Sequence, residues 1–231
     1  MAYLLSIDAS TNHASVALSN DNQVLALRSC GEQKEHAAFL QPAIAEVCTE
    51  AGVKLKELQA IAVTVGPGSY TGLRVSLASA KGLCYALQLP LITTGTLEVM
   101  ALAAQQHMAE FHPHVNSYLL CPLIDARRQE VFTAIYSNSL KCVKPPFAHI
   151  LTGDSFIPEL NQQPVVFFGT GAAKWEAMCE HSNALFEQVH WHAGTVALLA
   201  FEKWKQQDFA SLAYSTPMYI KEFHTTVSSK K

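Results

Sequence analysis

The sequence predicts an α/β protein made of two duplicated lobes that face each other across a cleft. The tripeptide Ile7-Asp8-Ala9 recurs as Ile124-Asp125-Ala126, and each copy ends one apolar strand-like segment and precedes another. A strand followed by a Gly-x-Gly turn also occurs twice, at Gly66-Pro67-Gly68 and at Gly169-Thr170-Gly171. Short matches can arise by chance, but their shared order favours an internal duplication. The two motifs lie closer together in the second copy, so we expect that copy to lack a long helix.

The first half alternates strand and helix patterns. Apolar or alternating segments predict a three-strand antiparallel meander at residues 3–7, 14–19 and 23–27. A helical pattern follows, which Gly52 is placed to end, and Pro42 belongs in its first turn or marks a kink. The apolar face of that helix comprises Leu40, Ile44, Val47, Cys48 and Ala51. Further along, we expect strands at 60–65 and 91–93 and helices at about 73–87 and 97–107.

The second half repeats this plan. The segment 131–136 corresponds to the second strand of the meander, and 165–168 corresponds to the strand before the glycine turn. We expect residues 1–110 to form the first lobe and residues 111–231 the second, with a C-terminal tail that could return to the first lobe.

Composition excludes several classes of protein. The chain has 231 residues, of which 49% are hydrophobic and only 15% charged, so it is a globular protein rather than a disordered one. Its formal net charge is −3, and Lys230-Lys231 is the only basic cluster. The sequence therefore lacks the charge pattern of a protein that binds a nucleic acid by itself.

Cysteines and apolar runs point to the cytoplasm. The six cysteines include no C-x-x-C pair, which favours reduced thiols over a disulfide scaffold or a metal clip. The first residues carry no positive n-region, and no apolar run approaches the roughly 18 residues of a membrane span. We expect a cytoplasmic chain with no membrane partner.

The duplicated strand–Asp–strand and strand–glycine–helix order resembles the actin, Hsp70 and sugar-kinase superfold, with its ribonuclease H-like lobes. That resemblance implies that the two Asp turns face the cleft, where such turns bind nucleotide phosphates. In the first turn, Asp8 could hold a hydrated cation, and Ser10 and Thr11 could donate to an anion. Alternatively, Asp8 and Ser10 bond their own backbone. In the second turn, Arg127 and Arg128 obstruct close approach of a phosphate.

The segment Gly66-Pro67-Gly68-Ser69-Tyr70-Thr71-Gly72-Leu73-Arg74 is more specific. Together with Lys34-Glu35-His36, both Asp turns and the ending Tyr214–Lys231, it resembles the TsaB (YeaZ) family, the paralogues of the threonylcarbamoyl-transferase TsaD. The resemblance covers essentially the whole chain.

The glycine-rich segment has two possible roles. Its glycines allow a sharp loop before a helix, and Ser69 and Thr71 are candidate caps. The helix start could bind an anion, but no lysine occupies the phosphate-loop position, which favours a structural role for Gly66, Pro67, Gly68, Ser69, Thr71 and Gly72.

The helix after this loop carries Ala78, Gly82 and Ala86 on one stripe. A glycine in a helix interior costs about 1 kcal/mol relative to alanine, so Gly82 suggests that another backbone approaches there. That neighbour could be internal or a second protein. Arg74 and Lys81 share a face, where solvation is the default expectation. The resemblance implies that the helices of the first lobe pack against TsaD or against a second copy. The expected interface comprises Glu35, His36, Leu40, Ile44, Tyr70, Arg74, Ala78, Lys81, Gly82 and Ala86.

Catalysis finds little support in the sequence. Alignment through Pro90-Leu91-Ile92 places the H-x-x-x-H metal pair of the transferase on Thr96 and Met100, which cannot replace imidazoles. His112-Pro113-His114 and His190-Trp191-His192 are weak metal signals, and Glu35 beside His36 favours a helix cap or interface rim over an acid–base pair. We expect no catalytic residue and no metal.

The resemblance therefore implies a noncatalytic subunit needed for N6-threonylcarbamoyladenosine (t6A) in tRNA. It would bind TsaD and work with the ATPase TsaE, form a homodimer when alone, and contact tRNA only through the complex. It would have no cofactor of its own, although ATP or ADP could bind within the complex. Two alternatives remain, a small-molecule kinase or ATPase of the same superfold and a metallopeptidase-like enzyme.

Overall fold

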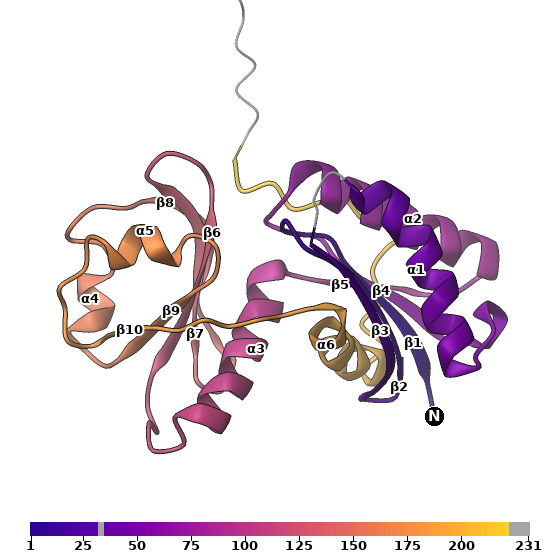
Figure 1. The fold of residues 1–231 in the computed structure, drawn as a ribbon, viewed down its shortest axis with the longest axis horizontal. Helices are drawn as coiled ribbons and strands as arrows, with labels where there is room; N and C mark the ends of the chain where they lie inside the picture. Colours follow the sequence, from indigo (N-terminus) through magenta and orange to yellow (C-terminus); the bar gives the residue numbers. More distant parts are fainter. Residues whose placement is uncertain (32–34, 222–231) are drawn as a thin grey trace, which may run out of the picture.

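The computed structural model describes residues 1–31 and 35–221 and contains two five-stranded sheets (Figure 1). The first sheet has the order β3-β2-β1-β4-β5 and the second the order β10-β9-β6-β7-β8. The strands of the first sheet are β1 (Tyr3–Asp8), β2 (Ala14–Asn20), β3 (Gln23–Cys30), β4 (Ala60–Thr64) and β5 (Leu91–Thr94). Those of the second are β6 (Leu119–Asp125), β7 (Glu130–Ser137), β8 (Cys142–Ile150), β9 (Val165–Phe168) and β10 (Ala184–Phe186).

The two sheets confirm the expected duplication. In each, three antiparallel strands are followed by two parallel ones, so β6 to β10 repeat the arrangement of β1 to β5. The meander strand that the sequence pattern did not reveal is β8, an edge strand whose Pro145 and Pro146 interrupt any alternation.

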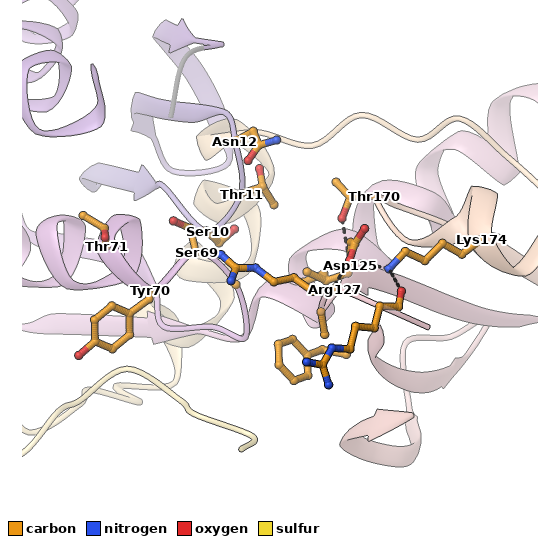
Figure 2. Close-up of a pocket in the computed structure, with 15 residues that line it drawn as sticks. Ser10, Thr11, Asn12, Ser69, Tyr70, Thr71, Asp125, Arg127, Thr170 and Lys174 are labelled. Carbon is orange, nitrogen blue, oxygen red and sulfur yellow. Dashed lines mark hydrogen bonds and ion pairs between the residues drawn. The ribbon is translucent and has the colours of Figure 1, made fainter. Parts of the chain in front are cut away.

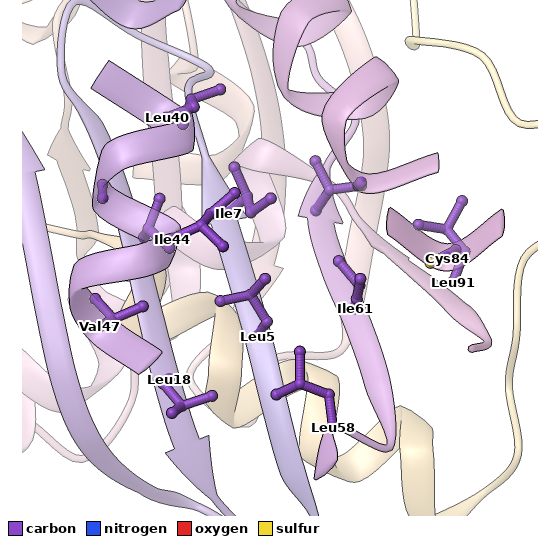
Figure 3. Packing of buried hydrophobic residues seen from close by; sticks show 14 of the residues in the cluster. Leu5, Ile7, Leu18, Leu40, Ile44, Val47, Leu58, Ile61, Cys84 and Leu91 are labelled. Atoms are coloured by element: carbon purple, nitrogen blue, oxygen red, sulfur yellow. The ribbon is translucent and has the colours of Figure 1, made fainter. Parts of the chain in front are cut away.

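Two helices cover the outer face of the first sheet, α1 (His36–Ala51) and α2 (Tyr70–Leu87), with the short 3-10 helix η2 (Leu55–Glu57) between α1 and β4. Successive apolar side chains of strand β1 point to opposite faces of the sheet. Leu5 and Ile7 pack with α1 and α2, whereas Leu4 packs on the opposite face. Figure 3 shows this outer core, in which Leu40 and Ile44 of α1 meet the sheet.

The second sheet has smaller outer helices, α4 (Ile157–Leu160) and α5 (Ala172–Glu176). Trp175 of α5 is fully buried among Phe156 and Phe167. Between its meander and the strand before its glycine turn, the second copy has only the four-residue α4, which confirms the expected lack of a long helix there.

The inner helices cross between the lobes. Helix α3 (Thr96–Phe111) follows β5 of the first sheet but packs on β6 of the second. Helix α6 (Ala193–Lys205) follows β10 of the second sheet but packs on β1 and β2 of the first. In Figure 1 the two helices lie side by side between the sheets, and they are in contact. Each lobe therefore contains a helix that directly follows a strand of the other lobe. The division between residues 110 and 111 stays a prediction.

The C-terminal segment returns to the first lobe. Ala210 pairs with Leu91 of β5, and the Met218 N–H donates to the Val65 carbonyl oxygen. Residues 222–231 of the predicted tail, and Lys34, lie outside the described residues. No helix among residues 1–31 and 35–221 is long and apolar enough to cross a bilayer.

The six cysteines differ in solvent exposure, and three of them are buried. Cys48, Cys84 and Cys121 are buried, whereas Cys142 is exposed, and all six cysteines are free. Burial raises the pKa of Cys84 to about 11 and that of Cys121 to about 12. These two thiols therefore behave as small apolar side chains rather than as nucleophiles.

The glycine-rich loop packs backbone against backbone on the first Asp turn. A Cβ atom at Gly68 would overlap the carbonyl oxygen of Ser10, and one at Gly72 would overlap that of Ala9. The Ser69 N–H donates to the Ser10 oxygen over 2.6 Å, and the Ser69 hydroxyl caps α2 by accepting from the Gly72 N–H. Ser69 is thus the cap, Thr71 is not, and α2 begins three residues earlier than the sequence pattern predicted.

Replacing Gly72 and Gly82 of α2 by alanine, one at a time, distinguishes the effect of the close backbone contact from that of helix propensity. Gly72→Ala should lower the free energy of unfolding by about 2–3 kcal/mol, because its Cβ must displace a strand-end carbonyl. Gly82→Ala should raise it by about 1 kcal/mol, because nothing lies within 4 Å of the added carbon. Urea unfolding of both variants measures the difference, and equal effects would contradict the contact.

Candidate functional site

A cleft of about 890 Å³ lies between the lobes (Figure 2). The two Asp turns, the start of α2 and the glycine turn before α5 together form its walls. Its lining residues are Ser10, Thr11, Asn12, Gly68, Ser69, Tyr70, Thr71, Ile124, Asp125, Ala126, Arg127, Arg128, Phe132, Thr170 and Lys174. The duplicated turns therefore meet, as the resemblance to the superfold implied.

Asp8 holds its own turn together instead of facing the cleft. Its side chain is buried, and its Oδ1 accepts hydrogen bonds from the Ser10 N–H over 3.0 Å and from the Thr64 hydroxyl over 2.7 Å. The Asp8 side chain thus bonds the backbone of its own turn, as one of the two possibilities left by the sequence required, whereas the Ser10 hydroxyl does not. Asp8 Oδ1 is thus used to join β1 to β4, and the cofactor-binding assignment of Asp8 stays a prediction.

The two hydroxyl residues of this turn do line the cleft. Ser10 is fully buried, and its hydroxyl makes no hydrogen bond within residues 1–31 and 35–221. The Thr11 hydroxyl accepts from the His13 N–H over 3.3 Å. Their expected role toward an anion stays a prediction.

The second Asp turn is built differently. Arg127 and Arg128 adopt left-handed backbone conformations, with φ of 69° and 51°, where glycine or asparagine is usual. The turn closes through a hydrogen bond from the Ala126 N–H to the Glu130 oxygen. Both arginine side chains border the cleft, so the obstruction that the sequence predicted lies at the cleft wall.

Asp125 is neutralised by Lys174 of α5. The Lys174 Nζ lies 2.7 Å from Asp125 Oδ1 and also donates to the Arg128 carbonyl oxygen. Partial burial alone would raise the pKa of Asp125, but the hydrogen bonds from Lys174 and from the Arg127 N–H outweigh it and lower that pKa. Asp125 is therefore an ionised, paired carboxylate.

These residues do not fit the magnesium nucleotide that the superfold implies. A catalytic Mg²⁺ needs carboxylate oxygens that face the phosphates. Asp8 is buried and shared between two donors, and Asp125 is held by Lys174. The cleft can accept negative charge beside Arg127 and Arg128, whereas Oδ1 of each turn aspartate already accepts hydrogen bonds from within the chain.

The position of the transferase's histidine pair is closed as well. Thr96 and Met100 begin α3 and are both fully buried. Met100 packs in the core of the second lobe with Leu97 and Phe168. Met100 therefore takes part in apolar packing, whereas the Thr96 hydroxyl is buried with no hydrogen-bond partner among the described residues.

The expected interface residues divide into two groups. Glu35, Tyr70, Arg74, Ala78, Gly82 and Ala86 are exposed, and Lys81 is partly exposed. Leu40 and Ile44 belong to the core between α1 and the first sheet, and His36 is only 2% exposed, with Nε2 3.1 Å from the Asn12 carbonyl oxygen. An interface role for these three is wrong, because they lie on the face of α1 that packs on the sheet.

The C-terminal segment binds two residues for which solvation was the default expectation. Arg74 stacks on Tyr70, 4.0 Å from the ring centre, and donates to the Tyr219 hydroxyl over 2.9 Å. Lys81 donates to the carbonyl oxygens of Ala213 and Ser215. The tail therefore borders the exposed face of α2.

Sequence reasoning missed one prominent side chain on this helix. Tyr85 is 73% exposed and lies three residues after Gly82, hence on a neighbouring face of α2. Its spacing from Gly82 was the available signal. Tyr219 was also missed as a partner of Arg74, because only the fold brings the tail to α2.

Comparison with known proteins gives consistent results. A family model described as TsaD: tRNA N6-adenosine threonylcarbamoyltransferase matches residues 31–216. A Bacillus subtilis protein named tRNA threonylcarbamoyladenosine biosynthesis protein TsaB is 29% identical over 181 residues, which cover 77% of this chain and 75% of that protein. The Escherichia coli protein of the same name is 35% identical over 136 residues, 58% of this chain and 55% of that protein. The chain thus spans about half the length of the latter relative.

A solved structure is similar over nearly the full chain. It is described as an uncharacterized protein with similarity to peptidase YEAZ from Pseudomonas aeruginosa. It has a TM-score of 0.80 and 26% identity, and the match covers 96% of this chain and 100% of that one. Together with the duplicated strand order, this confirms the fold class expected from the sequence. The chain belongs to the TsaD family of tRNA N6-adenosine threonylcarbamoyltransferases and, within it, to the TsaB (YeaZ) group.

Proposed function

We propose that this chain is a noncatalytic subunit in the biosynthesis of t6A in tRNA, and that it works by docking onto a TsaD-type transferase. Its relatives carry the name tRNA threonylcarbamoyladenosine biosynthesis protein, which supports the pathway. This role belongs to the cytoplasm, where the tRNA substrate is modified. The docking step is supported by the exposed face of α2.

The main support for docking is the exposed surface of α2 around Gly82. Ala78, Gly82 and Ala86 recur every four residues and are all exposed, and nothing lies within 4 Å of a Cβ built at Gly82. The close backbone neighbour that the sequence suggested is therefore not internal to the described chain. A stripe of small residues lets a partner helix approach to a short interaxial distance. We assign this stripe to a helix of the transferase.

Helix α1 extends the same surface. Gln41 of α1 donates to the Ser79 hydroxyl of α2, which ties the two helices together. Figure 1 shows both on the side of the first sheet away from the second lobe. A rigid pair of helices presents a surface that loses little conformational freedom on binding.

The noncatalytic assignment is supported by the side chains that occupy the expected catalytic positions. Thr96 and Met100 cannot supply imidazole ligands, and Asp8 is used within its turn. The alternatives of a kinase and a metallopeptidase therefore gain no support from these positions. In this proposal TsaE acts with the complex, ATP or ADP is a ligand of the complex, and tRNA is contacted through it.

Two substitutions on the exposed stripe test the docking. Gly82→Leu and Ala78→Arg should each abolish co-elution with TsaD in size-exclusion chromatography, because either side chain blocks a close helix approach. Both variants should remain folded by circular dichroism, and Gly82→Leu should gain helix stability of about 1 kcal/mol. Ala177→Arg, at an exposed position of the second lobe, is the matched control and should co-elute normally. If the stripe variants co-elute like the control, the proposed surface is wrong.

The same variants test self-association. The isolated chain should form a homodimer through this stripe, because in the absence of TsaD the same exposed surface is available to a second copy of the chain. Light scattering should show a dimer for the native chain and a monomer for Gly82→Leu. A Gly82→Leu chain that remains dimeric would show that the homodimer uses another surface.

A modification assay tests the absence of catalysis. The purified chain with threonylcarbamoyl-adenylate and unmodified tRNA should form no t6A, and addition of TsaD and TsaE with ATP should restore it. Nucleoside analysis by mass spectrometry is the measurement. Formation of t6A by the chain alone would falsify the noncatalytic assignment without affecting the docking result.

A further inference from the structure

Three metal-ligating side chains meet where the connector between β10 and α6 crosses the end of α3. His107 lies in the last turns of α3, His112 is its C-cap residue, and Glu187 follows β10 directly. The Nε2 of His107 is 3.0 Å from Glu187 Oε2, and the Nε2 of His112 is 2.9 Å from Glu187 Oε1. None of the three lines the inter-lobe cleft.

We propose that His107, His112 and Glu187 bind a divalent transition-metal ion, with zinc as the reference case. Two imidazoles and one carboxylate are a donor set that zinc and its first-row neighbours accept. Magnesium and calcium prefer oxygen ligands alone, so they are poor candidates. The three ligand atoms all lie within 4.8 Å of one another.

Two of the three spacings between these atoms are close to those of a metal shell. Ligand atoms at about 2.0–2.1 Å from a tetrahedral zinc are roughly 3.3 Å apart. The two imidazole–carboxylate distances of 2.9 and 3.0 Å need to lengthen by only a few tenths of an ångström. The third pair, the two Nε2 atoms, lies within 4.8 Å, so binding an ion combines an outward shift of Glu187 with an approach of the two imidazoles by up to about 1.5 Å.

The same imidazole nitrogens can serve as hydrogen-bond donors or as metal ligands. Without an ion, each imidazole donates an Nε2–H to one oxygen of Glu187. With an ion, each imidazole carries its proton on Nδ1 and offers the Nε2 lone pair, and Glu187 contributes an oxygen. The ion takes the place of two hydrogen bonds.

Burial suits a bound ion with one open position. The side chains of His107 and Glu187 are 22% and 20% exposed, whereas that of His112 is 41% exposed. The ring of His107 also packs on Phe111, with ring centres 4.7 Å apart, which helps to hold its orientation. Three protein ligands and one solvent position would complete a tetrahedral shell.

The site joins segments that serve different lobes. Helix α3 packs on the second sheet, and the connector after Glu187 leads to α6 on the first sheet. Val189 of this connector and Met108 of α3 belong to the same buried apolar cluster. An ion here would fasten the connector to α3 and so stabilise the crossed arrangement of the inner helices.

Sequence reasoning could not find this group. His107 and His112 are separated by four residues, a spacing within the H-x₃₋₅-H range that zinc ligands use, but Glu187 is distant in the sequence. The weak pair His112-Pro113-His114 contained one of the ligands but the wrong partner. Only the crossing of the connector over α3 brings the carboxylate to the imidazoles.

Metal titration of the full-length chain tests the site. After removal of metals with a chelator, ZnCl₂ should bind with 1:1 stoichiometry by calorimetry. At a hundredfold excess over its Kd, zinc should raise the melting temperature by about 5–10 °C, whereas MgCl₂ should not. CoCl₂ should give the visible absorption bands of tetrahedral cobalt.

Variants assign the ligands. Glu187→Gln and His112→Gln should each weaken zinc binding about tenfold or more. His114→Gln, two residues beyond a proposed ligand and exposed, should bind like the native chain, as should Cys142→Ser, which removes the exposed thiol. Circular dichroism checks folding, and His112, the most exposed ligand, keeps the test valid if Glu187→Gln unfolds.

The contrary results are equally clear. Absence of 1:1 zinc binding, or native affinity in both ligand variants, would show that the cluster is an ion pair and that the proposal is wrong. Loss of binding in Cys142→Ser alone would place the ion elsewhere and overturn it too.

Discussion

The contact on which the proposed docking surface depends is the backbone packing of the glycine-rich loop on the first Asp turn. Gly68 and Gly72 leave room for the carbonyl groups of Ser10 and Ala9, and Ser69 both donates to that turn and caps α2. This contact sets where α2 starts, and therefore which residues of α2 face outward. A loop that resembles a phosphate-binding motif thus acts as a joint between a strand end and a helix, which explains why it keeps its glycines without a phosphate-loop lysine.

The crossed inner helices impose a second constraint. Because α3 and α6 each pack on the sheet of the other lobe, the lobes cannot separate without exposing apolar surface on both. The cleft between the lobes therefore has a defined shape; Asp125 in its wall is paired with Lys174, and Asp8 behind it bonds within its own turn. The outer face of α2 is left as the surface with unused contact area, and the metal site proposed at the end of α3 would reinforce the crossing.

Local patterns revealed most of the fold. The alternation of β2, the apolar run of β4 and the stop at Gly52 were all visible in the sequence, since each depends on neighbours within a few residues. Strand β8 was hidden by its prolines, and the start of α2 by its glycines. The apolar stripe of α1 was recognised but assigned partly to an interface. Periodicity shows that Leu40 and Ile44 are buried and does not say whether the same chain or another one buries them.

The sequence by itself determined the duplication, the capped glycine loop and the small-residue stripe of α2, because these depend on residue type and on short spacings. Only the tertiary structure decided that Asp8 bonds inward, that Arg74 and Lys81 hold the returning tail, and that Glu187 lies between His107 and His112. Each of these contacts joins residues that the chain brings together through its turns, strand pairing and helix crossings. Side-chain partners at such separations are set by the path of the whole backbone, which local preferences do not specify.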